Sequence, residues 1–249
     1  LTAGLGENLA WERGPRTLEF GRIVRPRRLM RSTTILLVTS ALLLGLGCAP
    51  SNPGMVAEGI IGHDTSCLYT PTSAFLIEGS LDVATPPERV GGITYLAVFR
   101  VGNQLINNGN RVYPLMADPN RIVFDHVEVT LVDLNETVIA GPYLVPASGA
   151  VGSTASMDPT FGLASATIIP DNIGQSLAGF ADGSVIVARC RVMGTTAGGA
   201  QLTSGPVSFP ITLCNGCLFR CGRDEMGNAI ESLTCSPGQD GVSLVTSAC

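Results

Sequence analysis

Apolar and polar residues alternate with a period of two along much of the chain, which is the pattern of half-buried β-strands. In residues 75–83 the odd positions are apolar apart from Gly79, and the even positions are mostly polar. Residues 93–101 are apolar at nearly every position, which predicts a central strand that is covered on both faces. The same pattern predicts further strands at residues 122–133, 137–145, 161–169, 185–192 and 207–213.

Two of these strands carry signs of irregular pairing. In residues 122–133 the apolar face switches near Asp125, which predicts a β-bulge. Ile122 and Phe124 occupy one face, and Val127, Val129 and Leu131 occupy the other. In residues 207–213, Pro210 cannot donate a hydrogen bond to a neighbouring strand, so we expect an edge strand there.

Seven strands separated by turn-forming residues, with little helix, predict an all-β fold and an antiparallel sandwich. Residues 171–180 are the segment compatible with a short helix, although Gly174 and Gly179 weaken it. The arrangement over roughly residues 70–213 resembles an immunoglobulin-like or fibronectin-III-like domain in architecture. It lacks the Cys…Trp…Cys pattern of antibody domains, and a sandwich fold implies no function by itself.

The segment of residues 30–48 has the order of an export signal. Positive charge comes from Arg25, Arg27, Arg28 and Arg31, residues 35–46 are apolar, and Gly47 and Cys48 follow. An apolar run of this length is shorter than the roughly 20 residues of a membrane-spanning helix. The segment resembles a bacterial lipoprotein signal peptide, although Gly45 stands where that family usually has leucine.

The resemblance implies cleavage before Cys48 and acylation of its thiol, with palmitate among the attached chains. Because Ala49 rather than aspartate follows the cysteine, the resemblance further implies the outer membrane of a bacterial cell envelope. A plain secretory signal and an uncleaved membrane anchor remain the alternatives. We therefore expect an upstream, disordered extension over residues 1–29 and a signal peptide over residues 30–47. A flexible tether over residues 48–66, a β-sandwich over residues 67–213 and a cysteine-rich cap over residues 214–249 are expected to follow.

Composition and charge exclude several kinds of chemistry. All 15 cationic residues are arginine, so neither a Schiff-base lysine nor a phosphate-loop lysine exists, and two histidines are too few for a multi-histidine metal site. Residues 48–249 hold eight arginines against seventeen acidic residues, a net charge of −9 that disfavours nucleic acid as a partner. No glycine-rich loop follows a predicted strand and opens a helix, so neither a nucleotide nor another cofactor is expected.

The eight cysteines predict disulfide bonds in an exported chain. Cys190 shares the apolar face of its strand with Ile186 and Val192, which predicts a buried free thiol. With Cys48 acylated, six cysteines remain for three disulfide bonds, and one of these bonds is expected to join Cys67 to the cap. The six are Cys67, Cys214, Cys217, Cys221, Cys235 and Cys249.

Other pairings and uses of the cysteines remain open. A bridge between Cys67 and Cys190 would leave one tail cysteine unpaired. The close spacing of Cys214, Cys217 and Cys221 also suits a zinc or iron–sulfur site, and the first two could form a redox-active pair. No histidine lies near the possible metal site, and the possible redox pair lacks a thioredoxin-like setting. Structural disulfides are therefore the favoured interpretation.

Two classes of function follow. The first is a non-enzymatic, membrane-anchored lipoprotein with a structural, adhesive or binding role toward a protein or an envelope polymer. The second is a hydrolase or carbohydrate-active module on a β-scaffold, which the low aromatic content of 5% and the position of Trp11 upstream of the signal disfavour. His63 is expected in solvent, and His126 and Asp125 point to opposite faces of a strand, so no catalytic residues are assigned.

Overall fold

The computed structural model describes residues 54–84, 92–107, 118–232 and 234–245. Residues 50–249 belong to one compact unit, which is mostly β. Within the described ranges the strands are β1 (Met55–Ile60), β2 (Gly79–Asp82), β3 (Tyr95–Asn103), β4 (Ile122–Val132), β5 (Val138–Ser148), β6 (Ala150–Val151), β7 (Thr160–Ile169), β8 (Val185–Thr196), β9 (Gln201–Thr203), β10 (Val207–Cys214), β11 (Phe219–Cys221) and β12 (Ser243–Val245). A short helix, α2 (Asp171–Leu177), follows β7.

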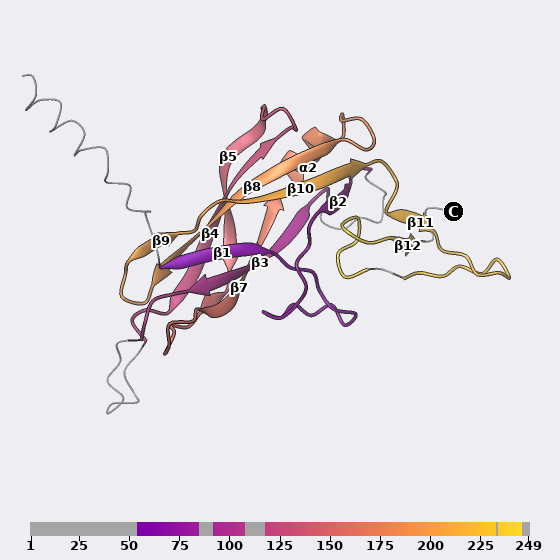
Figure 1. Ribbon diagram of the computed structural model, residues 1–249. Helices are drawn as coiled ribbons and strands as arrows, with labels where there is room; N and C mark the ends of the chain where they lie inside the picture. Colours follow the sequence, from indigo (N-terminus) through magenta and orange to yellow (C-terminus); the bar gives the residue numbers. More distant parts are fainter. Residues whose placement is uncertain (1–53, 85–91, 108–117, 233, 246–249) are drawn as a thin grey trace, which may run out of the picture. The chain divides into compact units, whose positions relative to one another are not determined.

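Ten of these strands form one curled, mixed sheet, which resembles half of a barrel (Figure 1). The order across it is β1-β3-β7-β5-β4-β8-β10-β2, with β6 beside β4 and β9 beside β8. Strand β5 turns the corner between two arms, because most of it pairs with β4 while only Ala147 and Ser148 pair with β7. Strands β11 and β12 form a separate parallel pair in the cap.

The core fills the inside of the curl and takes side chains from both arms. Roughly every second residue of β4, β7 and β8 is buried, as the alternation in the sequence requires, whereas β3 is buried at nearly every position. The largest fully buried side chains are Tyr95, Phe99, Met55, Ile60, Ile61, Leu81, Ile93, Ile122, Leu131, Ile168, Ile169 and Leu177. Burying a large apolar side chain of this kind contributes about 1.5–3 kcal/mol to the free energy of folding.

The all-β prediction is confirmed, and so is the bulge in β4. The pairing of β4 with β8 shifts register between Phe124 and His126, so that Asp125 is the extra residue. The helix expected within residues 171–180 is also present, although it is short.

The predicted antiparallel sandwich of about seven strands is not confirmed, because the sheet is continuous, mixed and richer in strands. Strand β2 lies parallel to β10, with Ile211 opposite Gly79. Strand β10 therefore has a neighbour on each side, and the expected edge strand is wrong. Its proline is accommodated because pairing with β2 begins at Ile211, one residue after Pro210.

The expected tether over residues 48–66 is also wrong for its described part. Residues Met55–Ile60 form β1, which pairs with β3 from Asn103 to Phe99. Only Met55 and Ile60 of this strand are fully buried, and a bulge between Ala57 and Gly59 interrupts the register. A strand with so little regular alternation carries no clear pattern in the sequence.

Replacing Leu131 by alanine tests the position of the core. Leu131 is fully buried, and we expect Leu131→Ala to lower the free energy of unfolding by about 3 kcal/mol through lost burial and a cavity. The matched control is Leu134→Ala, since Leu134 is 70% exposed in the following turn. Urea unfolding followed by circular dichroism measures both, and equal losses would contradict the assigned core.

Candidate functional site

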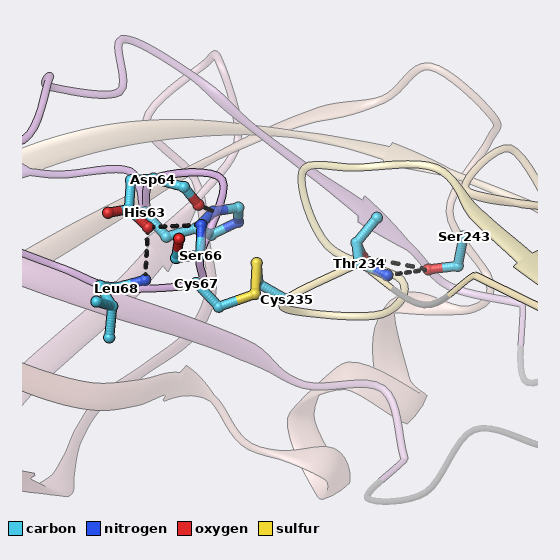
Figure 2. The surroundings of a disulfide bond; sticks show 8 residues. All are labelled: His63, Asp64, Ser66, Cys67, Leu68, Thr234, Cys235 and Ser243. Carbon is cyan, nitrogen blue, oxygen red and sulfur yellow. Dashed lines mark hydrogen bonds between the residues drawn. A yellow bond between two sulfur atoms is a disulfide. The ribbon is translucent and has the colours of Figure 1, made fainter.

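A disulfide joins the beginning of the domain to the cap. Cys67 is bonded to Cys235 across 168 residues of sequence, with the two Cα atoms 5.3 Å apart (Figure 2). Asp64 shapes the turn that presents Cys67, because its Oδ1 accepts hydrogen bonds from the backbone N–H groups of Ser66 and Leu68 at 2.8 and 2.9 Å. The bridge therefore rests on an ordered turn at one end and on the cap at the other.

A second disulfide, between Cys214 and Cys217, lies where the chain leaves β10 and enters the cap. The carboxylate of Asp82, which is fully buried, accepts hydrogen bonds from the N–H groups of Gly216 and Leu218, both at 2.8 Å. Asp82 and the two sulfur atoms lie within the spacing of a metal site. Because the sulfurs are bonded to each other, they offer no thiolates in this state, and the described geometry is that of a cross-linked loop.

The remaining cysteines differ in state. Cys221 is disulfide-bonded as well. Cys190 is a buried free thiol, and burial raises its pKa to about 12, so it has little thiolate character at neutral pH. Cys48 and Cys249 lie outside the described residues.

Gln239 and Asp240 fasten the cap to the sheet. The backbone of residues 238–240 runs beside β2, where the N–H of Asp82 donates to the carbonyl of Gly238 at 2.9 Å. The amide side chain of Gln239 accepts from the N–H of Leu96 at 2.8 Å and donates to its carbonyl at 2.6 Å. It thereby occupies the edge of β3 just beyond the point where β1 ends.

The carboxylate of Asp240 makes further hydrogen bonds to the sheet, and we call the contacts of Gln239 and Asp240 together the clamp. Its Oδ1 accepts from the N–H of Ser80 at 2.7 Å, and its Oδ2 accepts from the hydroxyl of Tyr95 at 2.7 Å. Burial of the ring and the neighbouring charge of Asp240 both raise the pKa of Tyr95. The phenol is therefore a permanent donor at physiological pH.

A small cavity of about 150 Å³ lies between the cap and the loop that follows β1. Its lining is partly apolar, with Ile60, Leu76 and Leu96, and partly polar, with His63 and Asp240 among the residues. The Asp240 carboxylate is already occupied by three donors, Ser80, Tyr95 and Gln239. Its hydrogen bonds therefore hold the cap in place.

A larger hollow, of about 470 Å³, lies on the outer face of the sheet across β4, β8 and β10. Arg189 and Arg191 project into it from alternate positions of β8, where both residues are exposed. Arg191 lies 3.4 Å from Glu128, and Arg189 pairs with Glu136. The other lining residues are Thr130, Pro142, Pro206 and Ser208.

This hollow holds two guanidinium groups, each of them in an ion pair with a glutamate, and Glu128 is itself part of the lining. Guanidinium groups bind carboxylates and phosphates through paired hydrogen bonds. The ion pairs that these groups make are solvent-exposed, and such pairs contribute roughly 0–1 kcal/mol to stability. Hydroxyl groups of Thr130 and Ser208 stand in the same lining.

Other polar residues noted in the sequence have structural surroundings. Asp125 accepts a hydrogen bond from the Thr195 hydroxyl at 2.6 Å, while His126 is exposed. Asp118 is partly desolvated, which opposes ionisation, but hydrogen bonds led by the Ser153 N–H outweigh this and lower its pKa. Asp171 accepts from the N–H of Ile93 at 2.8 Å.

The sequence did not reveal Asp82, Gln239 or Asp240, which attach the cap. Asp82 ends a strand, and Gln239 and Asp240 lie in a turn-like segment of the cap, but the backbone partners of all three lie far away in the chain. No motif marks such contacts. The arginines of the outer hollow were hidden for a related reason, because their neighbours come from other strands.

Comparisons with known proteins give little. No family model and no curated protein matches the chain. A solution structure described as that of a late embryogenesis abundant protein aligns with a TM-score of 0.31 and 13% identity, over 74% of this chain and 83% of that one. A likeness at this level carries no information on function. Within the part of the chain that the structure describes, the helical segments are too short or too polar to span a bilayer.

Loss of the long-range disulfide has a predictable cost. In the chain-entropy model a loop of 168 residues contributes about 5 kcal/mol, so we expect Cys67→Ser/Cys235→Ser to lower the unfolding free energy strongly. The control, Cys214→Ser/Cys217→Ser, opens a loop with a separation of 3 residues, worth about 2 kcal/mol in the same model. Urea unfolding measures both losses. Peptide mapping without reductant that found Cys67 free, or linked to Cys190, would contradict the pairing.

Proposed function

We propose that the protein is an exported, lipid-anchored component of a bacterial cell envelope, with a non-enzymatic binding role. The order of charge, apolar run, small residue and Cys48 in residues 30–48 supports export and acylation. Two or more acyl chains on one cysteine suffice for stable residence in a membrane.

The observation that carries this proposal is the disulfide between Cys67 and Cys235. Structural disulfides persist in oxidising compartments and are rare in a reducing cytosol. A bridge that ties the first part of a domain to its last part belongs to a protein that completes its folding after export. The pairing of Cys214 with Cys217 and the bonded state of Cys221 agree with this.

We propose further that the outer hollow binds an anionic group of a protein or an envelope polymer. Arg189 and Arg191 provide the cationic groups, each paired with a glutamate in the unbound state, and the acidic balance of residues 48–249 disfavours long polyanions such as nucleic acid. A short carboxylate-bearing segment suits a hollow of about 470 Å³ better than an extended polyphosphate does.

The curled sheet is proposed to be a distorted relative of the immunoglobulin-like sandwich. Its arms, β1-β3-β7 and β4-β8-β10, share one core, and β5 links them. Sandwiches commonly connect their layers through a strand that changes sheets.

Lipid attachment is tested by metabolic labelling. Labelled palmitate is expected to enter the unmodified protein and not Cys48→Ser, since that variant lacks the only proposed acylation site. The variant should also move from the membrane fraction to the soluble fraction. Equal labelling of both proteins would contradict the anchor.

Binding is tested with purified cell-wall sacculi, whose peptide stems carry free carboxylates. We expect Arg189→Ala/Arg191→Ala to weaken co-sedimentation about tenfold or more, because loss of a charged hydrogen bond costs about 1.5–3 kcal/mol. Arg223→Ala is the matched control, since Arg223 is exposed in the cap and its guanidinium donates to the carbonyl of Gly227. Unchanged binding by the double variant, or no binding by the unmodified protein, would contradict the proposal.

A further inference from the structure

We propose that the end of the sheet where β1 begins rests on the bilayer, with Ile106 and Met157 in contact with lipid. We call this end the proximal end, and it comprises residues 104–107, 118–121 and 152–159 together with the start of β1. The inference rests on the proposed acylation of Cys48. Beyond that anchor, it specifies which part of the domain touches the membrane and how the domain is oriented on it.

The short distance along the chain between Cys48 and Gly54 restricts how far the domain can lie from the lipid. Gly54 is already part of the folded domain, because its carbonyl accepts a hydrogen bond from the N–H of Gln104 at 3.0 Å. Only six peptide units separate it from Cys48. At full extension they reach about 22 Å. An acylated Cys48 therefore keeps the proximal end close to the membrane surface.

Hydrogen bonds gather the loops of the proximal end around the start of β1. The side chain of Asn103, which is fully buried, donates to the carbonyls of Asn120 and Gly152 at 2.8 and 3.0 Å. The N–H of Thr154 donates to the carbonyl of Leu105 at 3.0 Å, and Ile106 bridges to Thr154. These loops form one connected surface beside Gly54.

That surface presents apolar side chains to solvent. Met157 is 99% exposed and Ile106 is 54% exposed. The loop that carries Met157 is held in shape, since the Thr154 hydroxyl donates to the carbonyls of Ser156 and Asp158 at 3.1 and 2.5 Å. A fixed loop with an exposed methionine at its tip loses little conformational entropy when it enters the headgroup region.

Charge at the proximal end does not oppose such contact. Its described charged residues are Asp118, Arg121 and Asp158. The carboxylate of Asp118 is turned inward onto the N–H groups of Asn120 and Ser153, at 3.0 and 2.9 Å. The exposed charges therefore nearly balance, and zwitterionic lipid neither repels nor strongly attracts the surface.

The cap lies at the opposite end of the sheet. Strand β8 has twelve residues and spans roughly 36 Å. Its last residue, Thr196, pairs with Ile122 near the proximal end, whereas Val185, its first residue, pairs with Thr212 beside the start of the cap. Residues of the cap are therefore a natural reference that stays away from lipid.

Tryptophan fluorescence tests the orientation in the full, lipidated protein. Trp11 precedes the signal peptide, so the processed chain has no tryptophan, and Met157→Trp introduces a single probe at the proximal end. The matched control is Met226→Trp, because Met226 is 83% exposed in the cap. Both variants are reconstituted into zwitterionic phosphatidylcholine/phosphatidylethanolamine vesicles, with and without lipids brominated near the headgroup.

For Met157→Trp we expect a blue-shifted emission and loss of about half of its intensity in brominated vesicles, since interfacial contacts lie 5–10 Å into the boundary layer. For Met226→Trp we expect no change. Equal quenching of the two variants in protein that floats with the vesicles overturns the orientation and leaves the anchor intact. Failure to float, or palmitate labelling that does not depend on Cys48, overturns the anchor and the orientation together.

Discussion

The attachment of the cap to the curled sheet depends on two side chains, Gln239 and Asp240, that satisfy backbone groups which the sheet leaves unpaired. The sheet runs from β1 to β2 without returning to its start, so two edges are left with unpaired backbone groups. Residues 238–240 cover the edge of β2, and the amide of Gln239 bonds both backbone groups of Leu96 on β3. A buried N–H or carbonyl without a partner costs about 1–3 kcal/mol, so this attachment stabilises the edge of β2 and the part of β3 that extends beyond β1.

The attachment of the cap also explains the residues found at Gly79 and Asp82. Tyr95 lies beneath the clamp with its hydroxyl on Asp240, and a Cβ at Gly79 would come within 2.2 Å of that hydroxyl. Gly79 is therefore the one glycine at an apolar position in its segment because the tyrosine ring crosses that space. Asp82 acts similarly on the loop of Cys214 and Cys217, where it accepts from the N–H of the exposed Gly216 and from the N–H of the buried Leu218.

The sequence was sufficient for the strands whose side chains alternate between core and solvent. It located β4, β7, β8 and the bulge at Asp125 because burial of one face imposes a period of two. It located β3 by a different signal, the nearly continuous apolar run of a strand buried on both faces. It was insufficient for β1 and for the parallel pairing of β2 with β10, since pairing partners are chosen by the tertiary fold and leave no local pattern. Cys190 could be assigned to the buried face because it alternates in step with the apolar residues of its strand. The residues around Gln239, in contrast, contain no pattern that predicts its contact with Leu96.

The two ends of the domain are held together by different interactions, and their positions determine how a partner reaches the outer hollow. The cap end is held by a long-range disulfide and by the hydrogen bonds of Gln239 and Asp240, whereas the proximal end is held by hydrogen bonds that the side chain of Asn103 donates to backbone carbonyls. The hollow lies between them, on the face of the sheet formed by β4, β8 and β10. With the proximal end on lipid, β8 would rise from the membrane and Arg189 and Arg191 would face sideways. A polymer that runs parallel to the membrane could then reach both arginines without displacing the cap.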